Sequence, residues 1–134
     1  MRASRAGLAV FAIVVVLWSL VFVRNEVIGH AASGRIYDNP RMSAAEWDRA
    51  MEDFRRAELL DPGTKWAVAR AHWLVQREQH RAALRAADSI LGREPDNLDA
   101  WFVVLRASEG VDPARTEQAQ RAIERLNPPP ATNR

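Results

Sequence analysis

The sequence predicts an all-α protein in which one N-terminal transmembrane helix precedes about five antiparallel helices stacked as a short solenoid. Residues 6–23 form an apolar run without a charge. In the remainder of the chain, apolar residues recur at intervals of three and four, the period of a helix that buries one face. Pro62, Pro95 and Pro128 are 33 residues apart, and a constant spacing of this length indicates a structural repeat.

The apolar run is expected to span a membrane. A helix of 18 residues is about 27 Å long, close to the thickness of the hydrocarbon core. Twelve of the 18 residues are Leu, Ile, Val or Phe, which partition into the bilayer. A cleaved secretory signal is the alternative, because residues 1–5 form a short basic tail. A retained anchor is favoured, since the run is longer than the apolar core of a typical signal.

Basic residues flank the run on both sides, so the positive-inside rule separates the two orientations only slightly. The dense charge of the short N-terminal tail favours a cytoplasmic N-terminus and a C-terminal domain outside the cytoplasm. The strong preference for Arg over Lys and the abundance of Ala are typical of a GC-rich bacterial genome. The expected location is therefore the inner (plasma) membrane, crossed once.

Charge and composition exclude several classes of function. The excess positive charge lies beside the apolar run, and residues 35–134 carry sixteen basic and sixteen acidic residues. No nucleic-acid partner is therefore expected. The absence of cysteine excludes a disulfide framework, a thiolate zinc site and a cysteine nucleophile.

Residues 24–42 are expected to form a linker between the membrane and the repeats, because the segment contains two glycines and an Asn-Pro pair. A partial helix is the alternative for this segment. Ile28 and Tyr37 are the side chains expected to pack on the first repeat helix.

Local signals place the helices that follow. Ser43 and Glu46 have the spacing of a capping box, which predicts a helix start at residue 43. Gly92 is expected to end a helix in the left-handed conformation, and Asp112 to cap a helix that begins with a proline. With the apolar periodicity, these signals predict helices over residues 43–61, 64–77, 79–91, 98–109 and 113–126.

The second helix of each 33-residue unit carries a recurring pattern. In the first unit a small residue is followed by an aromatic four positions later, a small residue three later and a proline five later: Ala50, Phe54, Ala57 and Pro62. This pattern resembles the tetratricopeptide repeat (TPR). The next unit keeps the spacing with Ala83, Ala87, Ile90 and Pro95, and the third is shortened to Ala119, Ile123, Leu126 and Pro128.

The resemblance covers roughly residues 43–128 and implies a TPR-like domain of stacked helix pairs. The first helix of the family's repeat favours Trp six residues after the proline, and Trp101 follows Pro95 at that spacing. Residues 113–126 are mostly polar and suit the capping helix of a repeat array. Residues 129–134 are expected to form a disordered tail.

In the TPR family the first helices line a groove that takes a peptide or a partner helix. One face of the 64–77 helix would carry two tryptophans and two arginines at this groove, and the 98–109 helix would add an aromatic and an arginine. Aromatic and Arg side chains are common interface anchors. The predicted partner-binding residues are Trp66, Arg70, Trp73, Arg77, Phe102 and Arg106. In the alternative interpretation, both tryptophans pack inside and the arginines cover them with their alkyl stems.

No constellation for catalysis, metal binding or cofactor binding is found in the sequence. His72 and His80 lack a third ligand at a suitable spacing. Asp96 and Asp99 stand at a helix start, where they complement the helix dipole. An enzyme is therefore not expected.

The predicted function is a membrane-anchored scaffold that binds a protein or peptide partner and contacts the bilayer through residues 6–23. The alternative is a small accessory subunit of a bacterial envelope or membrane-assembly complex, held mainly by its transmembrane helix.

Overall fold

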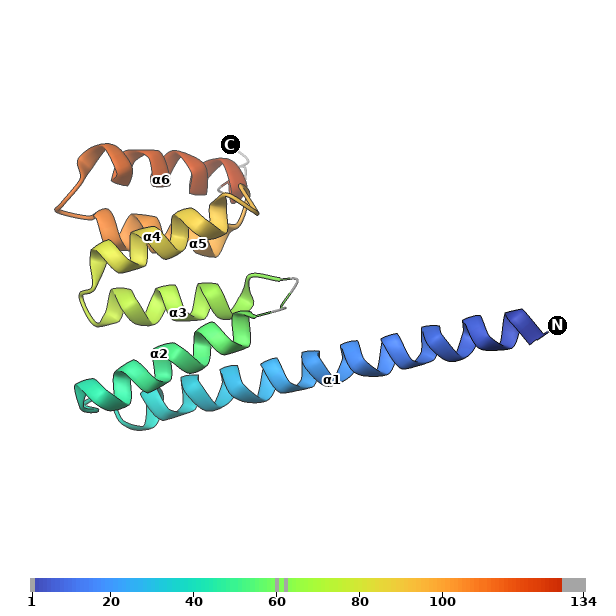
Figure 1. The fold of residues 1–134 in the computed structure, drawn as a ribbon. Helices are drawn as coiled ribbons and strands as arrows, with labels where there is room; N and C mark the ends of the chain where they lie inside the picture. Colours follow the sequence, from blue (N-terminus) through green and yellow to red (C-terminus); the bar gives the residue numbers. More distant parts are fainter. Residues whose placement is uncertain (1, 60, 62, 129–134) are drawn as a thin grey trace, which may run out of the picture. The chain divides into compact units, whose positions relative to one another are not determined.

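The computed structural model describes residues 2–59, 61 and 63–128, and the side chains from residue 7 onward within these ranges. Over these residues the protein is all-α, as predicted, and contains no strand (Figure 1). The chain divides into two compact units: unit 1, Met1–Gly63, and unit 2, Thr64–Arg134. The six helices are α1 (Arg2–Asp38), α2 (Ala44–Glu58), α3 (Lys65–Gln76), α4 (His80–Leu91), α5 (Leu98–Ser108) and α6 (Pro113–Leu126).

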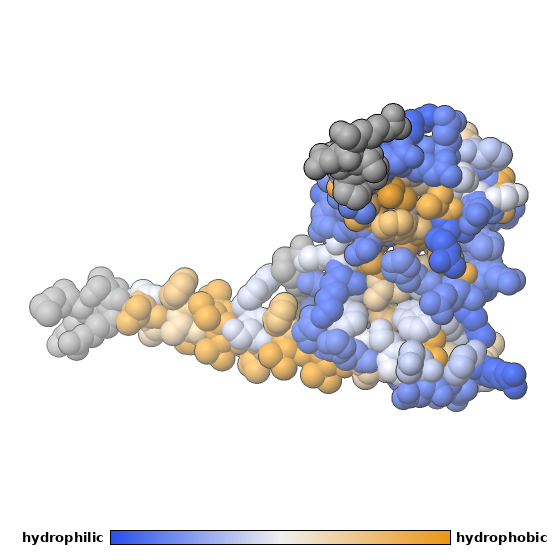
Figure 2. Space-filling view, turned by 180° about the vertical axis from the view of Figure 1, so that it is seen from behind, coloured by the Kyte–Doolittle hydropathy of each residue, from blue (hydrophilic) through white to orange (hydrophobic). Residues whose placement is uncertain are grey.

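The first helix of unit 1 is much longer than the apolar run that starts it. Its large apolar side chains between Leu8 and Val23 are exposed, from 71% at Leu8 to 46% at Val15, except for the half-buried Val21. Figure 2 shows this stretch as a hydrophobic rod. The helix is long and apolar enough to cross a membrane by length and composition. A rod that is apolar on every side suits lipid better than water.

The expected linker at residues 24–42 is wrong for most of its length, because α1 continues without a break to Asp38. Only residues 39–43 connect α1 to α2. The reason is tertiary packing on α2, which offsets the low helix propensity of two glycines. One side of the continued helix is buried at intervals of four, three and four residues, at Asn25, Gly29, Ala32 and Ile36.

The two side chains expected to pack from this segment behave differently. Ile28 is half-buried, whereas Tyr37 is 79% exposed. The prediction for Tyr37 is therefore wrong. Tyr37 directly follows the buried Ile36, and neighbouring residues on a helix point in different directions.

Helix α2 begins at the predicted capping box. The Glu46 amide donates to Ser43 Oγ at 3.3 Å, and the Ser43 amide donates to Glu46 Oε2 at 2.8 Å. These bonds from Ser43 favour the ionised carboxylate and hold the pKa of Glu46 below its usual value. Helix α2 buries one apolar stripe, as predicted, formed by Trp47, Ala50, Met51, Phe54 and Ala57.

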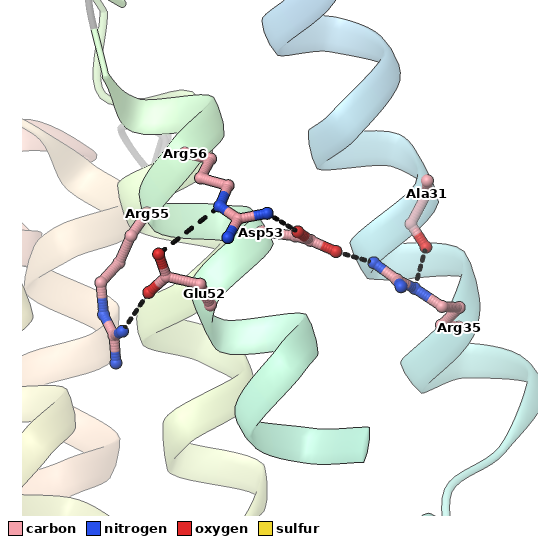
Figure 3. A network of polar contacts seen from close by, with 6 residues as sticks. All are labelled: Ala31, Arg35, Glu52, Asp53, Arg55 and Arg56. Atoms are coloured by element: carbon pink, nitrogen blue, oxygen red, sulfur yellow. Dashed lines mark hydrogen bonds and ion pairs between the residues drawn. The ribbon is translucent and has the colours of Figure 1, made fainter. Parts of the chain in front are cut away.

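Ion pairs cross the solvent side of the α1–α2 contact (Figure 3). Arg35 of α1 pairs with Asp53 of α2 and also donates from Nε to the Ala31 carbonyl at 3.2 Å. Asp53 is shared with Arg56, whose Nη1 lies 3.6 Å from Asp53 Oδ1. Arg56 and Arg55 both pair with Glu52. The network joins the two helices outside their apolar contact.

Unit 2 contains two successive helix pairs, α3–α4 and α5–α6, and α3 also packs on α5. Its helices begin and end within two residues of the predicted positions. Asp112 accepts a hydrogen bond from the Arg115 amide at 3.1 Å and Pro113 is the first helical residue, as predicted. Gly92 is right-handed, with φ −65°, so its predicted conformation is wrong. The left-handed glycine of unit 2 is Gly110, with φ +74°.

Alanines dominate the core of unit 2. Small side chains let neighbouring helices approach closely. Two ion pairs hold α6 outside this core: Arg115 pairs with Asp88 of α4, and Arg125 pairs with Asp96 in the loop before α5 at 2.9 Å. The alanines with no exposed surface are Ala71, Ala83, Ala87, Ala100, Ala107 and Ala119.

The predicted domain at residues 43–128 is divided between the two units, because α2 packs with α1 in unit 1. Four of the five residues of the predicted basic tail belong to α1. The predicted tail at residues 129–134 lies outside the residues that the structure describes.

Candidate protein-interaction face

The N-terminal ends of α3 and α5 are tied together through equivalent repeat positions. Thr64, the N-cap of α3, donates from Oγ1 to Glu94 Oε2 at 2.7 Å. Asn97 is the N-cap of α5 and lies 33 residues later; its Nδ2 donates to Thr64 Oγ1 at 3.0 Å and to Glu94 Oε2 at 2.7 Å. The bonds from Thr64 and Asn97 hold the pKa of Glu94 below its usual value. This network sets the register of α3 against α5.

A second contact holds the first turn of α5. The Trp101 indole donates from Nε1 to the Pro95 carbonyl at 2.9 Å. Trp101 stands six residues after that proline, the position at which the TPR-like pattern expects Trp. Its indole therefore anchors the loop before α5 to the helix itself.

Helix α5 presents an aromatic side chain between two opposite charges. Asp99, Phe102 and Arg106 are spaced by three and four residues, which places them on one side of the helix. Phe102 is 37% exposed, and the two charged residues are also exposed. These three residues are named the α5 line.

His72 of α3 belongs to the surroundings of the α5 line. Burial is the largest influence and lowers the pKa of His72, the Asp99 carboxylate raises it, and the Arg106 guanidinium lowers it. The net direction is downward, so His72 is neutral at pH 7. A neutral imidazole offers one donor and one acceptor.

The four predicted residues of α3 differ in accessibility. Trp66 is only 3% exposed, and the Lys65 ammonium lies 4.5 Å from the centre of its ring. Arg70 and Trp73 are half-buried. Arg77 is exposed and is the C-cap of α3, where its amide donates to the Trp73 carbonyl at 3.1 Å. The alternative interpretation, inward packing, therefore fits the burial of Trp66.

His72 and the four predicted residues of α3 lie on different sides of that helix. At about 100° per residue, His72 projects roughly a third of a turn away from the stripe that joins Trp66 to Arg77. Arg106 acts electrostatically on His72. The charges of Asp99 and Arg106 therefore act on the His72 side of α3.

Sequence reasoning named Phe102 and Arg106 but gave no binding role to Asp99 or His72. Asp99 is three residues before Phe102 and seven before Arg106, and this spacing could have placed it among the predicted partner-binding residues. The position of His72 depends on how α3 packs on α5, which the sequence pattern does not specify.

No group of three or more His, Asp or Glu side chains within the described part of the chain is placed to hold a metal ion. The N-terminal tie between α3 and α5 uses its polar atoms for hydrogen bonds among themselves.

Comparison with known proteins gives one partial similarity. The chain is 38% identical over 74 residues to cellulose synthase operon protein C of Salmonella typhimurium strain LT2. The similar region is 52% of this chain and 6% of the relative, so the chain spans a small part of the relative's length. No protein-family model matches the chain, and no solved structure matches it. The similarity is consistent with TPR-like helical repeats over half of the chain.

Proposed function

We propose that this chain is a membrane-anchored scaffold without catalytic activity, which holds a protein partner on the α5 line. Helix α1 crosses the bilayer through residues 6–23, once, in a plasma membrane. Unit 2 lies outside the cytoplasm. The observation that carries the proposal is the half-exposed Phe102 between Asp99 and Arg106, on a helix whose start is fixed by the Thr64–Asn97 tie.

This surface suits a peptide segment or helix of a protein. An accessible aromatic ring supplies apolar contact area, and Arg is among the residues most often found at the centre of interfaces. A negative charge on one side of the ring and a positive charge on the other favour one orientation of the bound segment along α5. The matching segment carries an apolar side chain against Phe102, an acidic group near Arg106 and a basic group near Asp99.

The relative's name points to a class of partner. Cellulose synthase operon protein C is named for an operon of polysaccharide synthesis. By that similarity, we infer a partner among the proteins of a membrane-bound polysaccharide synthase. The predicted stripe of Arg70, Trp73 and Arg77 remains a second candidate surface on the same unit.

The test is cross-linking in native membranes, followed by identification of the captured proteins. The Phe102→Ala/Arg106→Ala variant should lose the partner. Val111→Ala/Arg121→Ala is the control, because it removes an exposed apolar side chain and an exposed arginine elsewhere on unit 2. An Arg70→Ala/Arg77→Ala variant measures the α3 stripe separately.

A further variant replaces residues 6–23 with an unrelated transmembrane helix. The decisive result is capture of the same proteins by the α5 variant and by the α3 variant, but not by the helix replacement. In that case the scaffold proposal is wrong and the accessory-subunit alternative holds. A reporter fused to the C-terminus tests the side of the membrane: activity of a cytoplasmic reporter would reverse the proposed orientation.

A further inference from the structure

The C-terminal end of α2 is fastened to α1 at the point where the apolar run ends. Asn25 stands two residues after Val23, the last residue of the run. Its side chain is 3% exposed, and Nδ2 donates to the Leu59 carbonyl at 3.0 Å. Leu59 is the C-cap of α2 and has extended backbone. Helix α2 runs antiparallel to α1, so its end points back toward the apolar run (Figure 1).

This bond fixes the depth of Leu59 relative to a membrane. Two residues of α-helix rise about 3 Å, so the Leu59 carbonyl, hydrogen-bonded to the Asn25 side chain, lies about half a helical turn beyond the end of the apolar run. The headgroup layer on each side of a bilayer is roughly 5–8 Å thick. When residues 6–23 span the hydrocarbon core, Leu59 therefore lies within the headgroup layer.

The side chain of Leu59 is available to lipid. It is 60% exposed, although it is a large apolar residue held beside the membrane end of the hairpin. Val27, one turn beyond Val23 on α1, is 62% exposed. Arg24, next to Asn25, is also exposed, and its Nη1 donates to Asn25 Oδ1 at 3.4 Å. Apolar groups beside a basic residue are the usual chemistry of an interfacial membrane contact.

We propose that the C-terminal end of α2 is a second membrane contact, in which Leu59 inserts into the headgroup–acyl boundary of the leaflet from which α1 emerges. The inference rests on the proposed crossing of the membrane by α1. With two points of contact, α1 cannot tilt away from the side that carries α2 without withdrawing Leu59 from lipid. The hairpin would therefore hold one defined face toward the membrane surface.

The absence of cysteine in the chain allows a direct test. Single-cysteine variants Leu59→Cys, Val14→Cys and Tyr37→Cys of the full chain are labelled with the same environment-sensitive fluorophore. They are reconstituted in vesicles of phosphatidylethanolamine and phosphatidylglycerol. Val14 lies inside the apolar run. Tyr37 is 79% exposed, about 18 Å along α1 from Asn25.

The expected result is a blue-shifted emission at Leu59→Cys that is quenched by a nitroxide carried on a lipid, as at Val14→Cys. Emission at Tyr37→Cys should be that of the label in water, quenched by a soluble ion. If Val14→Cys reports lipid while Leu59→Cys reports water, the second contact is wrong and the anchor stands. If Val14→Cys also reports water, the proposed membrane crossing itself is wrong.

A fourth variant tests whether the hydrogen bond from Asn25 to the Leu59 carbonyl sets the depth of Leu59 in the membrane. Asn25→Ala, combined with Leu59→Cys, removes the donor to the Leu59 carbonyl. Lipid quenching of the Leu59 label should fall, whereas that of the Val14 label in the same Asn25→Ala background should not change. Unchanged quenching at Leu59 would show that Asn25 does not position the C-terminal end of α2.

Discussion

Unit 1 and unit 2 both use antiparallel helix pairs, but they stabilise those pairs in different ways. Unit 1 contains one pair whose first helix is also the apolar rod, and its packing uses large residues such as Trp47 and Phe54. Unit 2 contains two pairs that pack through alanines. The α3–α5 contact in unit 2 is further registered by a polar tie between equivalent repeat positions, Thr64 and Asn97.

The difference shows how a repeat can be joined to a membrane anchor. A single helix pair has little apolar surface to bury, so it needs large side chains. In unit 1 these are supplemented by the ion pair between Arg35 of α1 and Asp53 of α2. In unit 2 each pair is supported by the next, as is usual in a repeat array. The largest effects of substitution are therefore expected in the α1–α2 core.

Phe54→Ala should have the largest effect on stability. Phe54 of α2 is fully buried, and truncating a buried Phe costs about 3–5 kcal/mol. Hydrogen exchange of the full chain in detergent micelles should show loss of protection in α2 and in residues 24–38. Phe102→Ala is the matched control, because its ring is 37% exposed and its loss should be small.

The same measurement tests the division into units. Protection of the α4 and α5 amides should persist in Phe54→Ala. Equal loss of protection in all helices would mean that the two units unfold as one cooperative structure.

Ala83→Leu should have the next largest effect, now in unit 2. Ala83 has no exposed surface in α4, so a larger side chain forces neighbouring helices apart. Overpacking of this kind costs about 1–3 kcal/mol. Urea denaturation followed by circular dichroism should show a lower midpoint than wild type. Ala114→Leu, at an exposed position of α6, should leave the midpoint nearly unchanged; an equal effect of both variants would contradict the close packing proposed for Ala83.

The helices of unit 2 were predictable because their signals are local. Asp112 followed by Pro113 marks a helix start whatever the rest of the chain does. The segment 24–38 was not predictable in the same way, since Gly29 and Gly34 are local signals against a helix. The helical conformation of this segment is decided by the packing of Gly29 and Ala32 on α2. That packing involves residues that are distant in the sequence.

The candidate site was predictable in part for a similar reason. Phe102 and Arg106 are visible from their spacing on one helix. Their proximity to His72 comes from the packing of α3 on α5. The burial of Trp66 likewise requires the folded chain, because an amphipathic pattern does not say whether an aromatic stripe faces a core or a partner.

Two glutamates at helix starts give the smallest predicted effect and the most direct comparison of the units. Glu46 closes a capping box within α2, whereas Glu94 accepts bonds from Thr64 and Asn97 and so links two repeats. The pKa of each carboxyl is lowered in the folded chain from its ordinary value of 4.5. Ionised carboxylates therefore stabilise the fold above about pH 4.5, and this contribution is lost as the pH falls through the lowered pKa.

Urea denaturation at a series of pH values between about 3 and 6 should show this loss of stability. In Glu46→Gln and in Glu94→Gln, stability should depend less steeply on pH than in wild type. The amide of Gln can still accept a hydrogen bond but no longer titrates. Hydrogen exchange should locate the acid-induced opening at the start of α2 for Glu46, and at the starts of both α3 and α5 for Glu94. Opening confined to α5 when Glu94 is protonated would show that the Thr64–Asn97 bond alone holds the start of α3, and would remove Glu94 from the tie between repeats.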